Sequence, residues 1–267
     1  EGEEEIGSHH LPAFYRDHRQ RLAADAAYEP FWSQRTLTTP PMITLGTKGV
    51  IGLAFTCRAG DWGGPRAEIH SSVGNWVGNP AWRLIQALAS LIDEHQNLVV
   101  AGLPRLGERL PDDERLLALQ AARFAPDVVL ANLNTTRFKQ KLPAIDLLRN
   151  LAFAPVLNIN GLQSGYLGEG SHTILPTQAR ALTDLRLPPG FEVEATVAAI
   201  RRHLDRHGFS DIEMSMDSGY PGARTPYAAP VIQAQIAAYR AHGFEPHVRP
   251  VEASATPYYL FTDVLGL

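Results

Sequence analysis

The chain opens with Glu1-Gly2-Glu3-Glu4-Glu5-Ile6-Gly7-Ser8, which sets four carboxylates within five positions. Taken alone, such a run is typical of a solvated acidic terminus. Carboxylates at this density also repel one another unless a cation or a raised pKa relieves them. A divalent metal does so, because one carboxylate can bind the ion while its neighbour takes a proton from a metal-bound water. The stretch is therefore compatible with an acidic tail or with part of a metal site.

Secondary-structure patterns elsewhere indicate a mixed α/β protein. Strands are predicted at 26–30, 50–58, 154–161, 209–216 and 248–251, and helices at 11–24, 80–91, 192–208 and 230–242, with more helical turns between 97 and 150. Between residues 50 and 216 the order is strand, helix, strand, strand, helix, strand, which is the ferredoxin-like order.

Five quoted stretches resemble one family, the co-catalytic zinc peptidases and deacylases, which includes carnosinase-type dipeptidases, acetylornithine deacetylase, succinyl-diaminopimelate desuccinylase and glutamate carboxypeptidase. They are EGEEEIGS at 1–8, LGTKG at 45–49, EIHSS at 68–72, GNP at 78–80 and DLRLPPG at 184–190. The resemblance covers nearly the whole chain. It implies a partial zinc-peptidase catalytic domain with an inserted ferredoxin-like α+β lid or dimerisation domain that carries a helical insertion.

The same resemblance implies domain boundaries. Residues 1–46 and 217–267 are expected to belong to the catalytic domain. Residues 47–216 are expected to form the lid, with the helical insertion at about 97–150.

Three glutamates are implied to form the metal-dependent half of an active site. Laid on the family motif E-G-x-E-E-x-G-S, Glu4 takes the general-base position and Glu5 a zinc-ligand position. Glu29, at the end of the strand predicted at 26–30, takes the place of a second zinc ligand, because strand ends point into the crevice where α/β proteins bind ligands. The alternative for Glu29 is an ordinary strand-end residue beside a loop.

These ligands are too few for the two zinc ions that a complete family site holds. Two carboxylates do not make a zinc site, which normally has three or four protein ligands including histidine. The family's H-x-D histidine, its bridging aspartate and its late histidine have no counterpart here. We therefore expect either a fragment of a longer enzyme, as the abrupt ends of the chain suggest, or an inactive homologue.

Three lid residues are implied to contact the substrate. His70 matches the lid histidine that reaches the partner subunit's active site and steadies the oxyanion; the alternative is a solvent-exposed loop histidine. Arg186 matches the residue that binds the substrate carboxylate, and it can also pair with Asp184 on the same strand face. Thr173 stands where a second substrate contact is made. The loop at 252–261 matches a pocket loop but lacks its glycines, with Ala253-Ser254-Ala255 in their place.

Composition limits the function further. The formal net charge of −4 argues against a nucleic-acid-binding surface, and no run of 18 apolar residues predicts a membrane span. Cys57 is the only cysteine, which excludes an internal disulfide and favours a reducing, cytoplasmic compartment.

The sequence thus predicts a zinc-dependent hydrolase of peptide or amide bonds next to a carboxylate. A dipeptidase or carboxypeptidase that forms a homodimer through its lid is the first choice. An N-acyl amino acid deacylase of the same family and a non-catalytic dimerisation or binding homologue are the alternatives.

Overall fold

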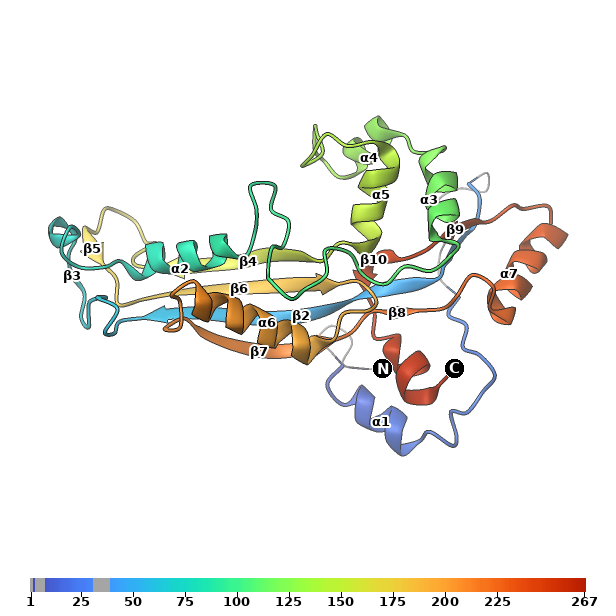
Figure 1. Cartoon of the computed structure of the whole chain (residues 1–267), viewed down its shortest axis with the longest axis horizontal. Coiled ribbons are helices and arrows are strands. Elements are labelled where there is room, and N and C mark those ends of the chain that lie inside the picture. Colours follow the sequence, from blue (N-terminus) through green and yellow to red (C-terminus); the bar gives the residue numbers. More distant parts are fainter. Residues whose placement is uncertain (1, 3–7, 31–38) are drawn as a thin grey trace.

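The computed structural model describes residues 2, 8–30 and 39–267. Its central element is β2 (Gly46–Arg58), a 13-residue strand that runs along most of the elongated body in Figure 1. Four strands pair with it: β6 (Gln178–Leu187), β7 (Glu213–Tyr220), β8 (Ala223–Arg224) and β10 (Glu252–Ala255). One more strand, β4 (Val156–Ser164), pairs with β6 and forms an edge of the sheet.

The predicted ferredoxin-like unit is confirmed. Its strands lie in the order β7-β2-β6-β4 and every neighbouring pair is antiparallel. Two helices, α2 (Pro80–Ser90) and α6 (Val193–Arg206), connect them. The prediction for the last strand was wrong in position. β7 begins at Glu213 because residues 209–212 form a turn that buries Ile212 in the core.

Only one face of this sheet is covered by the two helices. Alternate residues of β2 point to each side, so Ile51, Leu53 and Phe55 are buried against the helices. The helices contribute Leu84 and Ile200 to the same core. The opposite face carries partly exposed or exposed side chains, among which Leu182 of β6 is 47% exposed.

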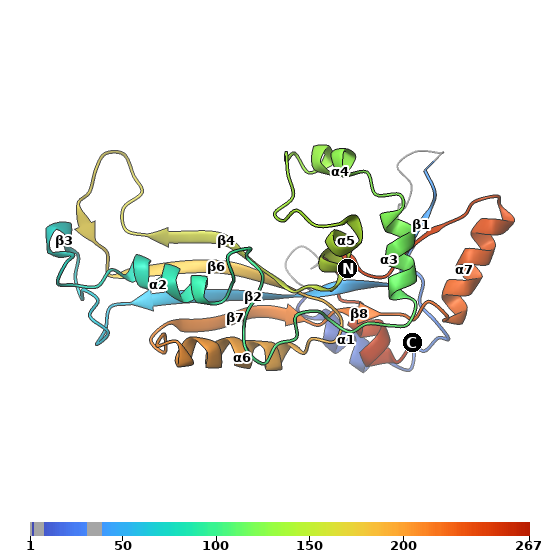
Figure 2. The ribbon, with the colours of Figure 1, turned by 45° about the horizontal axis from the view of Figure 1, so that its top comes forward.

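The segment predicted as a lid insertion contains three helices, α3 (Asp113–Ala121), α4 (Pro126–Asn132) and α5 (Ala144–Phe153). They rise from one end of the sheet (Figure 2). Leu116 of α3 packs with Ile43 of β1 (Met42–Thr44) and Ile236 of α7 (Pro230–Ala241) in a second core. The insertion therefore contacts segments that lie on both sides of it in the sequence.

The remaining elements are short. β1 pairs in parallel with β9 (His247–Arg249), and β3 (Ile69–His70) pairs with β5 (Ile174–Leu175). A 3-10 helix covers Ser71–Val73 and a π-helical stretch covers Leu260–Leu265. Within the described ranges, every helix is too short or too polar to cross a membrane.

Two sequence predictions near the amino terminus are wrong. α1 (Leu11–Asp17) is about two turns shorter than expected, since residues 18–22 continue as hydrogen-bonded turns. The strand expected at 26–30 is absent. Its Ala26-Ala27 pair has low strand propensity, and the described part of the chain offers it no strand to pair with.

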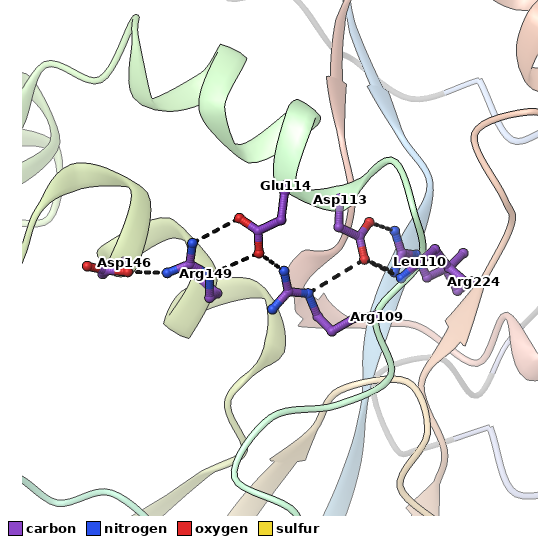
Figure 3. Close-up of polar contacts among 7 residues, drawn as sticks. All are labelled: Arg109, Leu110, Asp113, Glu114, Asp146, Arg149 and Arg224. Carbon is purple, nitrogen blue, oxygen red and sulfur yellow. Dashed lines mark hydrogen bonds and ion pairs between the residues drawn. The ribbon is translucent and has the colours of Figure 1, made fainter.

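An ion-pair cluster with a buried pair, Asp113 and Arg224, at its centre joins the insertion to β8 (Figure 3). Asp113, at the first turn of α3, is fully buried. Its carboxylate accepts hydrogen bonds from both terminal guanidinium nitrogens of Arg224, and the one from Nη1 to Oδ2 is 2.7 Å long. The backbone N–H of Leu110 donates to the same carboxylate at 2.7 Å. Glu114, one residue on, pairs with Arg109 and with Arg149 of α5. The cluster thus ties α3, α5 and β8 together.

We predict that Asp113→Asn destabilises the protein strongly. The change leaves the 5% exposed Arg224 side chain without its counter-charge, and breaking a buried pair in this way typically costs about 3–5 kcal/mol. Equilibrium denaturation by urea measures the loss. Asp112→Asn is the matched control, because its pair with Arg115 is partly exposed and should contribute less than about 1 kcal/mol. Equal effects of the two variants would contradict the role given to Asp113.

Candidate active site

Three strands of the sheet place Arg186 and Tyr220 in one row. Val50 of β2 pairs with Arg186 of β6 on one side and with Tyr220 of β7 on the other. Directly paired residues of antiparallel strands point to the same face of the sheet. This is the face that the two helices leave open, and the row lies at the end of β2 where the ferredoxin-like unit meets the rest of the chain.

A cavity adjoins the Tyr220 end of this row. Its volume is about 140 Å³, and Ser8, Tyr220, Pro257 and Tyr259 are among its lining residues. The rings of Tyr220 and Tyr259 stack with their centroids 6.1 Å apart. The pocket loop expected at 252–261 therefore meets Ser8, the last residue of the acidic motif. Glu4 and Glu5 themselves lie outside the described residues.

The Arg186 side chain is oriented by its strand neighbour. Its Nε donates to Oδ2 of Asp184 at 2.7 Å, as expected for residues on the same strand face. The side chain remains 36% exposed. Among the described residues, no hydrogen bond or ion pair engages its two terminal nitrogens. That pair of nitrogens is the part of a guanidinium that grips a carboxylate bidentately.

Lys48 is a buried cation that sequence analysis missed. It is 3% exposed, and its Nζ donates to the carbonyl oxygen of Ala154 at 2.7 Å. Burial, and secondarily the positive charge of Arg186, lower the pKa of its amine to about 8. The Leu45–Gly49 stretch carries the family resemblance and spans the expected domain boundary, and it gives Lys48 no role. The strand was expected to begin at residue 50, whereas β2 begins at Gly46 and includes Lys48.

His70 and Thr173, predicted separately, are brought together by the pairing of β3 with β5. Nε2 of His70 lies 3.1 Å from Oγ1 of Thr173. The backbone N–H of Ser72 donates to Nδ1 of His70 at 3.2 Å, so in the neutral ring the proton is assigned to Nε2. The imidazole is thereby presented as an N–H donor from an exposed position.

The structure does not bring His70 to Arg186 within one chain. β3 and β5 lie at the far tip of the body, opposite α1 and the two termini (Figure 1). Along β6, Gln178 and Arg186 are eight residues apart, which is about 26 Å at a strand rise of about 3.3 Å per residue. His70 and Thr173 lie beyond the Gln178 end of that strand.

Glu29 lies in an exposed segment without regular structure, where its carboxylate accepts a hydrogen bond from the Tyr258 hydroxyl. Burial, and secondarily Glu29, raise the pKa of Tyr258. No three His, Cys, Asp or Glu side chains gather into a metal-binding group among residues 2, 8–30 and 39–267. The described residues therefore do not fit a complete metal centre by themselves.

Cys57 is an ordinary core residue. It is fully buried under the helices, and burial raises the pKa of its thiol to about 11. A thiol with so high a pKa is a poor nucleophile at neutral pH.

The amino-acid sequence matches a family model described as a peptidase dimerisation domain over residues 45–211. It is 24% identical to the Cys-Gly metallodipeptidase DUG1 of Saccharomyces cerevisiae over 63% of this chain and 34% of that protein. It is 26% identical to the human Beta-Ala-His dipeptidase over 77% of this chain and 39% of that protein. The chain thus spans only about a third to two fifths of these curated relatives.

The fold is similar to that of a solved metallo-carboxypeptidase from Sulfolobus solfataricus. The TM-score is 0.83 at 27% sequence identity, and the match covers 100% of this chain and 59% of that one. The family model alone covers more than half of the chain, and it begins one residue before β2 and ends just after α6. The chain therefore belongs to the M20 peptidase family and contains that family's dimerisation domain.

Proposed function

We propose that the protein is a metal-dependent dipeptidase or carboxypeptidase that cleaves a peptide bond next to a free carboxylate. The observation that carries the proposal is the position of Arg186. Its unengaged guanidinium edge lies in one row with Tyr220, which lines the cavity that Ser8 of the acidic motif also lines. A peptidase that cleaves next to a free carboxylate needs a carboxylate-binding group near its catalytic residues, and Arg186 can serve as that group.

Each proposed residue has one role. Arg186 binds the substrate carboxylate through its two terminal nitrogens. Glu4 takes a proton from the attacking water and returns it to the leaving amine. Glu5 and Glu29 are proposed as two of the ligands of a zinc pair, and such ions polarise the scissile carbonyl and activate water. Because the described residues do not complete a metal centre, no further step is assigned to the metal.

His70 and Thr173 are proposed to act on the active site of a second copy. Their place at the tip supports this, since one chain keeps them far from Arg186. Nε2–H of His70, which lies 3.1 Å from the Thr173 hydroxyl in the single chain, is proposed to donate to the oxyanion that forms on the attacked carbonyl.

A homodimer formed through the ferredoxin-like unit would bring the β3–β5 tip of one chain, with His70 and Thr173, to the active site of the other. β4 is a nine-residue edge strand whose Ile159 is 53% exposed, and α2 exposes Trp82. An uncovered edge strand of this kind is a template for pairing with another chain. The Ala253-Ser254-Ala255 departure in the pocket loop still favours the non-catalytic homologue as the second candidate.

We predict that Arg186→Lys weakens substrates with a free carboxylate by at least about tenfold in kcat/KM, while amidated analogues change little. Lysine keeps the charge but cannot make the two parallel hydrogen bonds, and a hydrogen bond to a charged group contributes about 1.5–3 kcal/mol. Steady-state kinetics on matched acid and amide substrates measure the difference. Equal losses for both would remove Arg186 from carboxylate recognition.

We predict that His70→Ala lowers kcat in the complete enzyme by about 100- to 1,000-fold, the usual effect of losing one oxyanion donor. Thermal stability and metal content should stay nearly unchanged, because the side chain is exposed and its hydrogen bonds among the described residues are to Ser72 and Thr173. Thr173→Val is the companion variant, and it should have a smaller effect. Normal turnover of His70→Ala would exclude the role.

The trans arrangement has its own test. A mixed dimer of one His70→Ala subunit and one Glu4→Ala subunit keeps one site with both groups intact. Mixing the two inactive proteins should therefore restore part of the activity, measured after isolation of the tagged heterodimer. A verified heterodimer without activity would show that His70 does not act across the interface.

A further inference from the structure

We propose that Lys48 is the second cation of the carboxylate-recognition site, so that Lys48 and Arg186 together select substrates with a free carboxylate. The inference rests on the function proposed above and extends it to a residue with no assigned role. Lys48 is a specificity-determining residue in this account, and it acts on the bound carboxylate through its charge.

The geometry places the two cations on one face. Lys48 and Val50 are two residues apart on β2, so their side chains share a face, and Val50 is the direct partner of Arg186. Lys48 and Arg186 are therefore diagonal neighbours across one pair of strands, a relation that long side chains can bridge. The hydrogen bond from Nζ to Ala154 holds the amine at the entrance to β4, whose first residue Val156 also pairs with Arg186.

The charges around the pair do not balance. Asp184 is the single carboxylate that contacts either cation among the described residues, and it is bound to Nε of Arg186. The other strands beside Lys48 bring Glu252 on β10 and Arg224 on β8. Each of these is already neutralised, by Arg249 and Asp113 respectively.

The α5 side is neutral as well, because the two carboxylates there, Glu114 and Asp146, are balanced by Arg149 and Arg109. One positive charge is therefore left over in a largely buried place. An isolated buried cation is unfavourable, and burial accordingly lowers the pKa of the Lys48 amine to about 8. An incoming carboxylate supplies the missing negative charge.

The charge state of Lys48 gives the experiment its readout. Below its pKa of about 8 the amine is protonated and attracts the carboxylate, and above that value the attraction is lost. Binding of a carboxylate should raise the pKa in turn. Substrate preference for acid over amide should therefore fall as pH rises through about 8, by about tenfold for each unit by which binding raises the pKa.

The test compares kcat/KM of a dipeptide and its carboxy-terminal amide between pH 6.5 and 9.5 (roughly 1.5 units either side of the Lys48 pKa) in the complete enzyme. The ratio of the two substrates cancels every titration that they share. Wild type should lose its preference across this range. Lys48→Met should show a low preference that no longer depends on pH, and Lys48→Arg should keep a high preference at the alkaline end. A pH-independent ratio in wild type, or a wild-type profile in Lys48→Met, overturns the proposal.

Arg186→Gln separates this inference from the proposed function. If that variant retains the acid preference, the proposed carboxylate recognition fails as a whole. If it loses the preference while Lys48→Met behaves as wild type, only the role of Lys48 fails.

A direct measurement covers the case in which Lys48→Met does not fold. NMR titration of the Lys48 side chain in the full wild-type chain should give a higher pKa in sodium acetate than in sodium chloride of equal ionic strength. An identical pKa in the two salts overturns the proposal.

Discussion

The burial of Asp113 against Arg224 is the constraint on which the arrangement of the molecule depends. A carboxylate with no solvent exposure is tolerated only because a guanidinium and a backbone N–H satisfy it. Those partners come from β8 and from the residues before α3, so the pair forms only when the insertion and β8 are both in place. At the same junction the backbone at Gly222 packs closely against β2. A Cβ on Gly222 would lie 2.9 Å from the carbonyl oxygen of Thr47, so glycine is required there.

The same junction organises the candidate site. β2 crosses it without a break, pairing first with β8 and β10 and then with β6 and β7. The residues proposed to bind a carboxylate, Arg186 and Lys48, lie at this crossing and not at the tip. His70, the proposed oxyanion donor, lies at the other end of the strands. In the proposed homodimer, one chain would supply the carboxylate-binding residues of a site and its partner would supply the histidine.

Much of this could be predicted from sequence, and the failures have physical causes. The strand and helix order gave the ferredoxin-like unit because its burial alternates cleanly along β2 and β6. The two-residue spacing of Asp184 and Arg186 predicted their contact, since side chains two apart share a strand face. The contact of His70 with Thr173 needed the pairing of two short strands 103 residues apart, which no local pattern contains. Lys48 escaped notice because its hydrogen-bond partner, the carbonyl oxygen of Ala154, is 106 residues away in the chain. The strand at 26–30 failed because a strand needs a partner as well as a propensity.

Because β2 is long, a small rotation at its base moves the β3–β5 tip by a large distance. Thirteen residues of strand extend about 40 Å, so a rotation of only 5° at the junction would move the tip by about 3.5 Å. That displacement is several times the range of about 0.5 Å (roughly 2.7 to 3.2 Å) within which the donor–acceptor distance of an N–H···O hydrogen bond normally lies. In the proposed homodimer, the accuracy with which His70 reaches the attacked carbonyl would depend on how rigidly the junction holds β2. Asp113 and Arg224, which tie that junction together, would then affect turnover as well as stability.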